Sequence, residues 1–239
     1  MGYTTKVVEV GSDAEAFLAE QTAITFAGDA PEALRPYCFI IEKADLVGDL
    51  RESIDKAIEL GTGLEEFRRD FSKIVQKHGW TGWTGEGSAA GEAWRTRVIY
   101  QTNMATSYAA DRYRQLTDPD FIALFPFWRY VHNDGVMHPR PLHVSWDGLI
   151  LRAENPWWRT HYPPNGWGCQ CKVIGLWPRD LARLGKSQPD QAPEVVWTDR
   201  LIGQNSPGGP REVTVPEGID PGFEYAPGRD RWRSYRSKE

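Results

Sequence analysis

Residues 161–171 read HYPPNGWGCQC and end in two cysteines separated by one residue. The segment CQCKVIGL (169–176) has the composition of a strand, and side chains two apart on a strand point to the same face. A strand that starts after Gly168 would present both thiols to one ion. Zinc takes four ligands from thiolate and imidazole, and soft thiolates favour zinc over magnesium or calcium. Cys169 and Cys171 are therefore predicted to be zinc ligands.

Histidines are concentrated in the same part of the chain. Four of the five histidines and two of the three cysteines fall within residues 132–171. His143 stands at the head of a strand predicted over HVSWDGLIL (143–151) and is the expected third ligand. The fourth ligand is predicted to be His138 or His161, which lie in the flanking loops.

Two other interpretations of these residues stay open. In the first, Cys169 and Cys171 are small buried strand residues, and the histidines are hydrogen-bond partners in loops. In the second, one cysteine is a nucleophile, His143 is its base, and Asp134 or Asp147 orients the base, as in a cysteine hydrolase. Neither cysteine adjoins a helix N-terminus, which would lower the pKa of a thiol. Asp134 and Asp147 each precede a glycine, so both also fit turn positions.

The composition is that of a folded protein with one large or two small domains. The chain has 239 residues, of which 40% are hydrophobic and 26% charged. Its net charge of −5 argues against a dedicated nucleic-acid coat protein, which is usually basic. No stretch approaches the roughly 20 apolar residues that cross a bilayer, and the N-terminus lacks the layout of a secretory signal. The protein is therefore expected to be made in the cytosol. A disulfide framework is not expected there, because the compartment is reducing.

The N-terminal half has helical periodicity. Apolar residues at helical spacing over 44–78, with Gly61 between two segments, predict a helical hairpin. Thr62 and Glu65 match a capping box at the start of the second helix. A longer helix is predicted over residues 91–116.

The residues that follow alternate in the manner of strands. FPFWRYVHND (125–134), HVSWDGLIL and CQCKVIGL predict three strands joined by long loops, and WPRDLARLG (177–185) predicts a short helix. The 11 tryptophans lie largely in loop-like stretches, where they are expected to clamp irregular backbone. The predicted fold class is α+β, with a helical N-terminal half packed on a small sheet that is expected to be antiparallel.

The main domain is assigned to residues 44–186, with helices over 44–116 and the β and metal-site part over 125–186. Both ends of the chain are predicted to lie outside this domain. Residues 1–43 are weakly patterned and predict an N-terminal arm that orders against a partner. Residues 187–239 are rich in Pro and Gly and predict an extended tail that packs on another molecule or on the domain surface. The end of this tail is basic, which predicts contact with DNA phosphate or an acidic partner. Its basic residues are Arg229, Arg231, Arg233, Arg236 and Lys238.

Three longer stretches carry a family resemblance. RTRVIYQTNMATSYAADRYRQL (95–116), FWRYVHNDGVMHPRPLHVSWDGLIL (127–151) and PWWRTHYPPNGWGCQCKV (156–173) match the phage Mu F-like head morphogenesis family in order and spacing. The chain resembles that family over roughly residues 44–185. The most specific positions are Asp134, Arg140, His143 and Gly148, followed by Pro163, Pro164, Cys169 and Cys171. Some relatives carry cysteine where this chain has Arg140 and His143. Arg140 cannot bind a metal, so the fourth ligand must come from elsewhere.

The resemblance implies a structural function in a virus particle. Members of that family are minor head proteins of tailed phages, which assist head assembly at the portal vertex and accompany DNA packaging or ejection. The implied partners are the portal protein, the major capsid protein and phage DNA, with no membrane. The implied locations are the host cytoplasm during assembly and then the virion. No catalytic residue is assigned, and the alternative is a metal-dependent or cysteine hydrolase, a nuclease or protease, that acts in head maturation.

Overall fold

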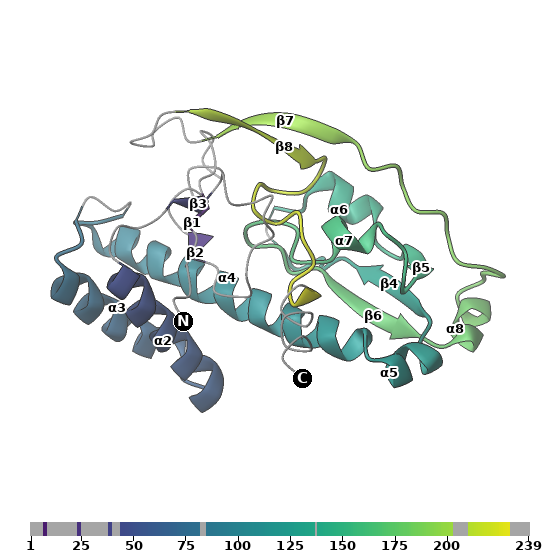
Figure 1. Cartoon of the computed structure of the whole chain (residues 1–239), viewed down its shortest axis with the longest axis horizontal. Helices are drawn as coiled ribbons and strands as arrows, with labels where there is room; N and C mark the ends of the chain where they lie inside the picture. The colour runs from purple at the N-terminus through teal and green to yellow at the C-terminus, as the bar shows by residue number, and fades with distance from the viewer. Residues whose placement is uncertain are drawn as a thin grey trace. The chain divides into compact units, whose positions relative to one another are not determined.

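The computed structural model describes residues 44–81, 85–136, 138–202 and 210–229, together with short strands at 7–8, 23–24 and 38–39. These residues form an α+β fold of helices and small antiparallel sheets (Figure 1). The chain divides into two compact units, one of Met1–Thr106 with Arg200–Val213 and the other of Ser107–Asp199 with Thr214–Glu239. The division falls within the long helix α4 (Ala89–Leu116). None of the described helices has the length and apolar composition needed to cross a bilayer.

The first unit is built on the predicted helical hairpin. Helices α2 (Ala44–Leu60) and α3 (Leu64–His78) lie side by side (Figure 1). Their apolar faces and the N-terminal part of α4 share one core, formed by Leu46, Leu50, Ile54, Phe67, Phe71, Ile74 and Ile99. Full burial of each such side chain contributes about 1.5–3 kcal/mol, so this core is the main stabilising feature of the hairpin. The unit also holds β1 (Val7–Val8), β2 (Ala23–Ile24) and β3 (Cys38–Phe39), which pair antiparallel in the order β2-β1-β3.

The connection between α2 and α3 differs from the predicted capping box. Gly63 is the N-cap of α3 and makes no side-chain cap, while Glu65 forms an ion pair with Arg68. The carbonyl of Thr62 accepts a hydrogen bond of 2.9 Å from the hydroxyl of Tyr100 in α4. The predicted box is therefore wrong, because α3 begins one residue later than a Thr62 cap would require.

The second unit contains a three-stranded antiparallel sheet in the order β5-β4-β6. The central strand is β4 (Phe127–Val131), flanked by β5 (Ile150–Arg152) and β6 (Lys172–Leu176). Successive side chains of β4 point to opposite faces. One face forms a core with helix α8 (Pro178–Arg183), made of Phe127, Ile150, Leu176 and Leu181. On the other face, the ring of Trp128 contacts those of Tyr113, Trp158 and Tyr162.

The end of α4 and helix α5 (Pro119–Leu124) cover this second face at β6. A Cβ added to Gly175 would lie within 3.2 Å of the side chains of Phe121, Phe125 and Leu116. The absence of a side chain at Gly175 therefore lets these two helices approach the strand closely.

Two predicted strands begin later than expected, which changes how the candidate ligands are held. Residues Pro141–Ser145 form the short helix α6, and β5 starts only at Ile150. Pro141 occupies the first turn of α6, where its missing N–H has no intrahelical role. Because β6 starts at Lys172, both cysteines lie in the loop before the strand and not on one strand face.

Aromatic rings clamp the loops of this unit, as expected from the tryptophan content. Helix α7 (Trp158–His161) lies within the long loop between β5 and β6. The indole Nε1 of Trp158 donates to the carbonyl of Arg152 at 3.1 Å. Further ring contacts join Tyr130 to Trp146 and Trp157, and Trp157 to Trp146 and Trp158.

The described residues after β8 contact loops of the second unit. The segment predicted to be an extended tail also contains an unpredicted two-stranded sheet of β7 (Trp197–Ile202) and β8 (Arg211–Pro216). Beyond β8, the backbone N–H of Asp220 donates to the carbonyl of Asn165 at 3.0 Å. Apolar side chains on either side of this contact are buried, including those of Ile219, Phe223 and Ala226.

Candidate metal centre

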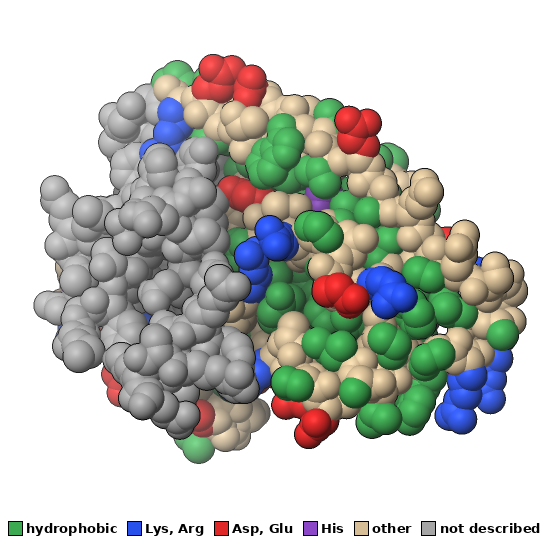
Figure 2. Space-filling view, turned by 45° about the vertical axis from the view of Figure 1, so that its right-hand side comes forward, with side chains coloured by type: hydrophobic (Ala, Val, Ile, Leu, Met, Phe, Trp, Pro, Cys, Tyr) green, Lys and Arg blue, Asp and Glu red, His purple; other side chains and the backbone are tan. Residues whose placement is uncertain are grey.

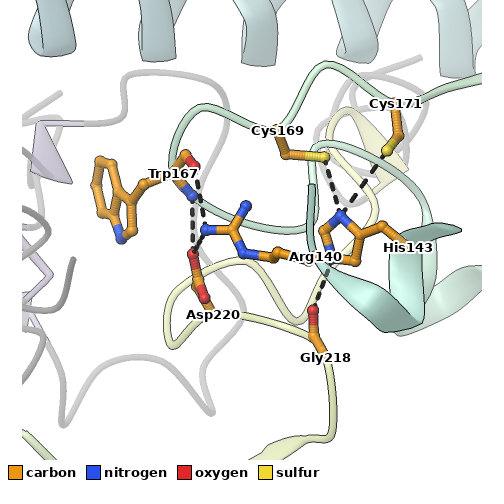
Figure 3. Close-up of polar contacts among 7 residues, drawn as sticks. All are labelled: Arg140, His143, Trp167, Cys169, Cys171, Gly218 and Asp220. Carbon is orange, nitrogen blue, oxygen red and sulfur yellow. Dashed lines mark hydrogen bonds and ion pairs between the residues drawn. The ribbon is translucent and has the colours of Figure 1, made fainter. Parts of the chain in front are cut away.

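Three of the predicted ligands converge in the second unit. The Sγ atoms of Cys169 and Cys171 lie 3.7 and 3.8 Å from Nδ1 of His143 (Figure 3). The ligand atoms of these three residues all lie within 4.8 Å of one another. A tetrahedral zinc ion with bonds of about 2.3 Å to sulfur and about 2.0 Å to nitrogen holds such atoms about 3.5 Å apart. The arrangement therefore fits one zinc ion with little movement of the side chains.

Short, irregular segments bring these side chains together. His143 projects from α6, and the two cysteines come from the loop before β6. Within that loop, the N–H of Cys169 donates to the carbonyl of Gly166 at 3.1 Å, which closes a turn. Gly168 adopts a left-handed conformation (φ +67°) in this turn, which favours glycine at that position.

The imidazole of His143 is oriented from both sides. Its Nε2 lies 2.8 Å from the carbonyl oxygen of Gly218 (Figure 3), and its ring stacks on Trp146 with centroids 5.3 Å apart. A carbonyl can only accept, so Nε2 carries the proton and the lone pair of Nδ1 faces the two sulfurs. Metal-binding histidines are commonly fixed in this way by a carbonyl on the second nitrogen.

The two thiols share one proton in this arrangement. The pKa of Cys171 is lowered to about 3, chiefly by the hydrogen bond from Cys169 and also by hydrogen bonds with Tyr130 and His132. The same sulfur–sulfur hydrogen bond, together with burial, raises the pKa of Cys169 well above its ordinary value of 9.0. Backbone N–H groups of Asn165 and Cys171 point at the Cys169 sulfur and favour its thiolate. A cation bound between the sulfurs would replace the shared proton, since thiolate is the form that binds metals.

His132 also reaches this cluster, although it was not among the predicted ligands. Its Nδ1 lies 3.4 Å from Sγ of Cys171, and its side chain is buried. It directly follows β4, and its backbone N–H donates to Oδ1 of Asp147 at 2.9 Å. The strand register explains its position, because Val131 pairs with Lys172 and the next antiparallel pair outward is His132 with Cys171.

The other two predicted ligands lie outside the close group. His138 is exposed. His161 is buried, stacks on Trp157 with centroids 4.3 Å apart, and places Nδ1 2.8 Å from the hydroxyl of Thr160. Burial lowers the pKa of His161 to about 4, so its imidazole is neutral at pH 7.

Arg140 braces the cysteine loop at Trp167. Its Nη2 donates to the carbonyl of Trp167 at 3.1 Å and to Oδ2 of Asp220 at 2.6 Å (Figure 3). The same carboxylate oxygen accepts the backbone N–H of Trp167 at 2.9 Å. Asp220 thus joins the C-terminal segment to the loop that carries the cysteines.

The remaining predicted site residues have simpler surroundings. Asp134 is exposed in a turn, and Asp147 accepts the backbone N–H of His132. Arg229 is half-buried, while the other basic positions predicted to contact DNA or a partner, Arg231, Arg233, Arg236 and Lys238, lie outside the described residues. On the face drawn in Figure 2, histidine shows only as a small patch among hydrophobic side chains.

The fold and the site together define a small α+β protein whose loops meet at an enclosed cluster of imidazole and thiol groups. The chain belongs to the Phage Mu protein F like protein family, whose profile matches residues 48–174. A second profile, described as the PTS system glucitol/sorbitol-specific IIA component, matches residues 2–62 only, and this short match does not assign a family.

Two relatives show the same relationship over most of the chain. "Putative capsid assembly protein F" of Escherichia phage Mu is 35% identical over 159 residues, which cover 62% of this chain and 35% of that protein. "Mu-like prophage FluMu F protein" of Haemophilus influenzae is 37% identical over 166 residues, which cover 67% of this chain and 39% of that protein. The chain thus spans less than two-fifths of the length of either relative. No solved structure gives a significant match.

Proposed function

We propose that this chain is a minor head protein of a tailed phage, which binds the portal protein or the major capsid protein and assists head assembly at the portal vertex. The family membership supports this role, and the phage Mu relative is described as a capsid assembly protein. Its place is the virion, reached from the host cytoplasm during assembly, and it accompanies DNA packaging or ejection. Because the chain spans only part of each relative, this role is proposed for the shared segment.

The enclosed His/Cys cluster is the observation that favours a structural role. His143 is 2% exposed and Cys169 is 7% exposed. A catalytic metal keeps one coordination position open to water or substrate, whereas a structural metal is enclosed by protein ligands. Small units with long loops gain stability from such a site, because metal bound to the folded form adds to the free energy of unfolding.

A cysteine hydrolase is the alternative, because the lowered pKa of Cys171 favours its thiolate and imidazoles lie beside it. The carboxylates proposed to orient a base are engaged elsewhere or exposed. The Nε2 of His143 is bound to the carbonyl of Gly218, while Asp147 accepts a backbone N–H and Asp134 is exposed. These contacts favour the structural role over the hydrolase.

Purified phage heads test the proposed role directly. The full chain is tagged in a phage that encodes it, and heads are isolated by sedimentation and analysed by mass spectrometry and electron microscopy. We expect the chain to be present at far fewer copies than the major capsid protein, and deletion of its gene to reduce the number of normal heads. Heads that lack the chain and form normally without it would overturn the proposal. Normal heads with unprocessed head proteins in the deletion strain would replace it with the hydrolase.

A further inference from the structure

We infer that His132 is the fourth ligand of a closed zinc site whose other ligands are His143, Cys169 and Cys171. Such a site goes beyond the proposed role, because it would exist whether or not the chain joins a phage head.

The strand register places His132 opposite Cys171. β4 and β6 pair antiparallel, with Tyr130 opposite Val173 and Val131 opposite Lys172. One step further along this ladder, each strand has ended and the next two residues are His132 and Cys171. The hydrogen bond from the His132 backbone to Asp147 holds that position at 2.9 Å. The sheet therefore fixes the distance between one imidazole and one thiol before any ion binds.

The distances among His143, Cys169 and Cys171 agree with tetrahedral coordination, and His132 lies beside one of these ligands, Cys171. Three sulfur–nitrogen distances are 3.4 Å for Cys171 with His132, 3.7 Å for Cys169 with His143, and 3.8 Å for Cys171 with His143. These values are close to the distance of about 3.5 Å that is expected between a sulfur ligand and a nitrogen ligand of one zinc ion. His132 stands beside Cys171 at the edge of the close group, so its ring must turn toward the other three ligands when the ion binds.

The competing histidines are less suited to this position. His138 is exposed and lies outside the group of ligand atoms that are within 4.8 Å of one another. His161 is buried between the rings of Trp157 and Trp146, with centroid distances of 4.3 and 5.1 Å, and it hydrogen-bonds to Thr160. Moving that ring would disrupt the aromatic cluster. Among the described histidines, His132 can therefore ligate with the least rearrangement.

The charge of this ligand set suits a buried divalent ion. Two thiolates neutralise the two positive charges of zinc, so the loaded site buries no net charge. Sulfur and imidazole select zinc over magnesium or calcium, which prefer oxygen. Four side-chain ligands leave no position for a catalytic water, which is the geometry of a structural site.

Metal content and cobalt spectra of the full chain test the assignment. Wild type is compared with His132→Ala, His161→Ala and, as a matched control, His138→Ala. We expect about one zinc per chain in wild type and His138→Ala. Loss of a residue that only orients a metal ligand weakens metal binding by about 10–100-fold. We expect His132→Ala to weaken zinc binding by more than this, because it removes a ligand. Its cobalt complex should also lose intensity in the visible bands typical of four-coordinate sites.

A fourth variant separates ligation from packing. His132→Cys offers a third thiolate, so it should restore cobalt binding with stronger sulfur-to-cobalt charge-transfer absorption than wild type. An unchanged cobalt spectrum and zinc affinity in His132→Ala would overturn the assignment of His132. The same losses in His161→Ala, with none in His132→Ala, would move the fourth position to His161. Absence of bound zinc and cobalt from folded wild-type protein would overturn the site as a whole.

Discussion

The Nε2 of His143 lies 2.8 Å from the carbonyl oxygen of Gly218, a residue 75 positions further along the chain. The family profile ends at residue 174, so this contact comes from a segment outside the matched region. The C-terminal segment therefore belongs to the candidate metal centre, because it selects the histidine nitrogen that faces the two sulfurs.

Gly218→Ala is expected to weaken both the fold and the metal site. Gly218 has φ +82°, and an added Cβ would lie 2.8 Å from the ring of Trp146 and 2.9 Å from Leu142. The left-handed conformation alone costs alanine about 1–2 kcal/mol, and the overlap adds to that. We expect zinc affinity to fall by about 10–100-fold as His143 loses its orientation. Urea denaturation and zinc competition with a chelator measure the two effects.

Gly185→Ala is the control for this substitution. Gly185 also has a positive φ (+73°), but an added Cβ would have no atom within 4 Å. The Gly185→Ala variant should be destabilised only by the cost of the left-handed conformation, and it should keep the zinc affinity of wild type. Equal zinc affinity in Gly218→Ala and Gly185→Ala would show that Gly218 does not orient His143.

Asp220→Ala is expected to destabilise the protein by about 3 kcal/mol, because hydrogen bonds with charged partners contribute about 1.5–3 kcal/mol each. The carboxylate accepts from both the guanidinium of Arg140 and the backbone N–H of Trp167, and its side chain is 15% exposed. The matched control is Asp134→Ala in an exposed turn, which should change the free energy of unfolding by less than about 0.5 kcal/mol. Similar urea midpoints for the two variants would contradict the bracing role of Asp220.

The sequence predicted the helices better than the site. The α2–α3 hairpin was predicted because the apolar side chains of its core recur at helical spacing. The segment 143–151 was misassigned at its start. LHVSW (142–146) fits both the helical and the strand periodicity, and Pro141 favours a helix only within the short turn that it begins. His132 and Gly218 were missed as partners of His143 and the thiols for a different reason. Their positions depend on the β4–β6 register and on a C-terminal segment without periodicity, and neither is readable from local pattern.

Glu224 is expected to make stability depend on pH. Burial raises the pKa of its carboxyl from the ordinary value of 4.5 to about 7, and its Oε2 accepts the N–H of Gly222 at 2.7 Å. Between pH 4.5 and about 7, the folded state keeps a proton that the unfolded state has lost. The free energy of unfolding therefore falls as pH rises through this window, and the destabilisation by the ionised Glu224 carboxylate is fully present above it.

Glu224→Gln should remove this component, because an amide does not titrate. The difference in urea midpoint between the variant and wild type is measured at pH 5 and at pH 8, which cancels the titration of groups that both proteins share. We expect the variant to gain stability relative to wild type at pH 8. A difference that is the same at both pH values would show that Glu224 does not titrate in this window.

Removal of zinc is expected to loosen the second unit around the site. Chelation of the wild-type protein, or the substitution Cys169→Ser or Cys171→Ser, should lower the melting temperature by more than about 5 °C, since each kcal/mol shifts it by about 2–4 °C in a chain of this size. Hydrogen exchange should speed up at the end of β4, in α6, in the cysteine loop and around Gly218, because the ion ties these segments together. The core of α2 and α3 contains none of the proposed ligands and should keep its protection.

Ser145→Ala, on the exposed side of α6, is the control and should respond to chelation as wild type does. Exchange that is unchanged by chelation in zinc-loaded wild-type protein would show that the ion does not stabilise these loops.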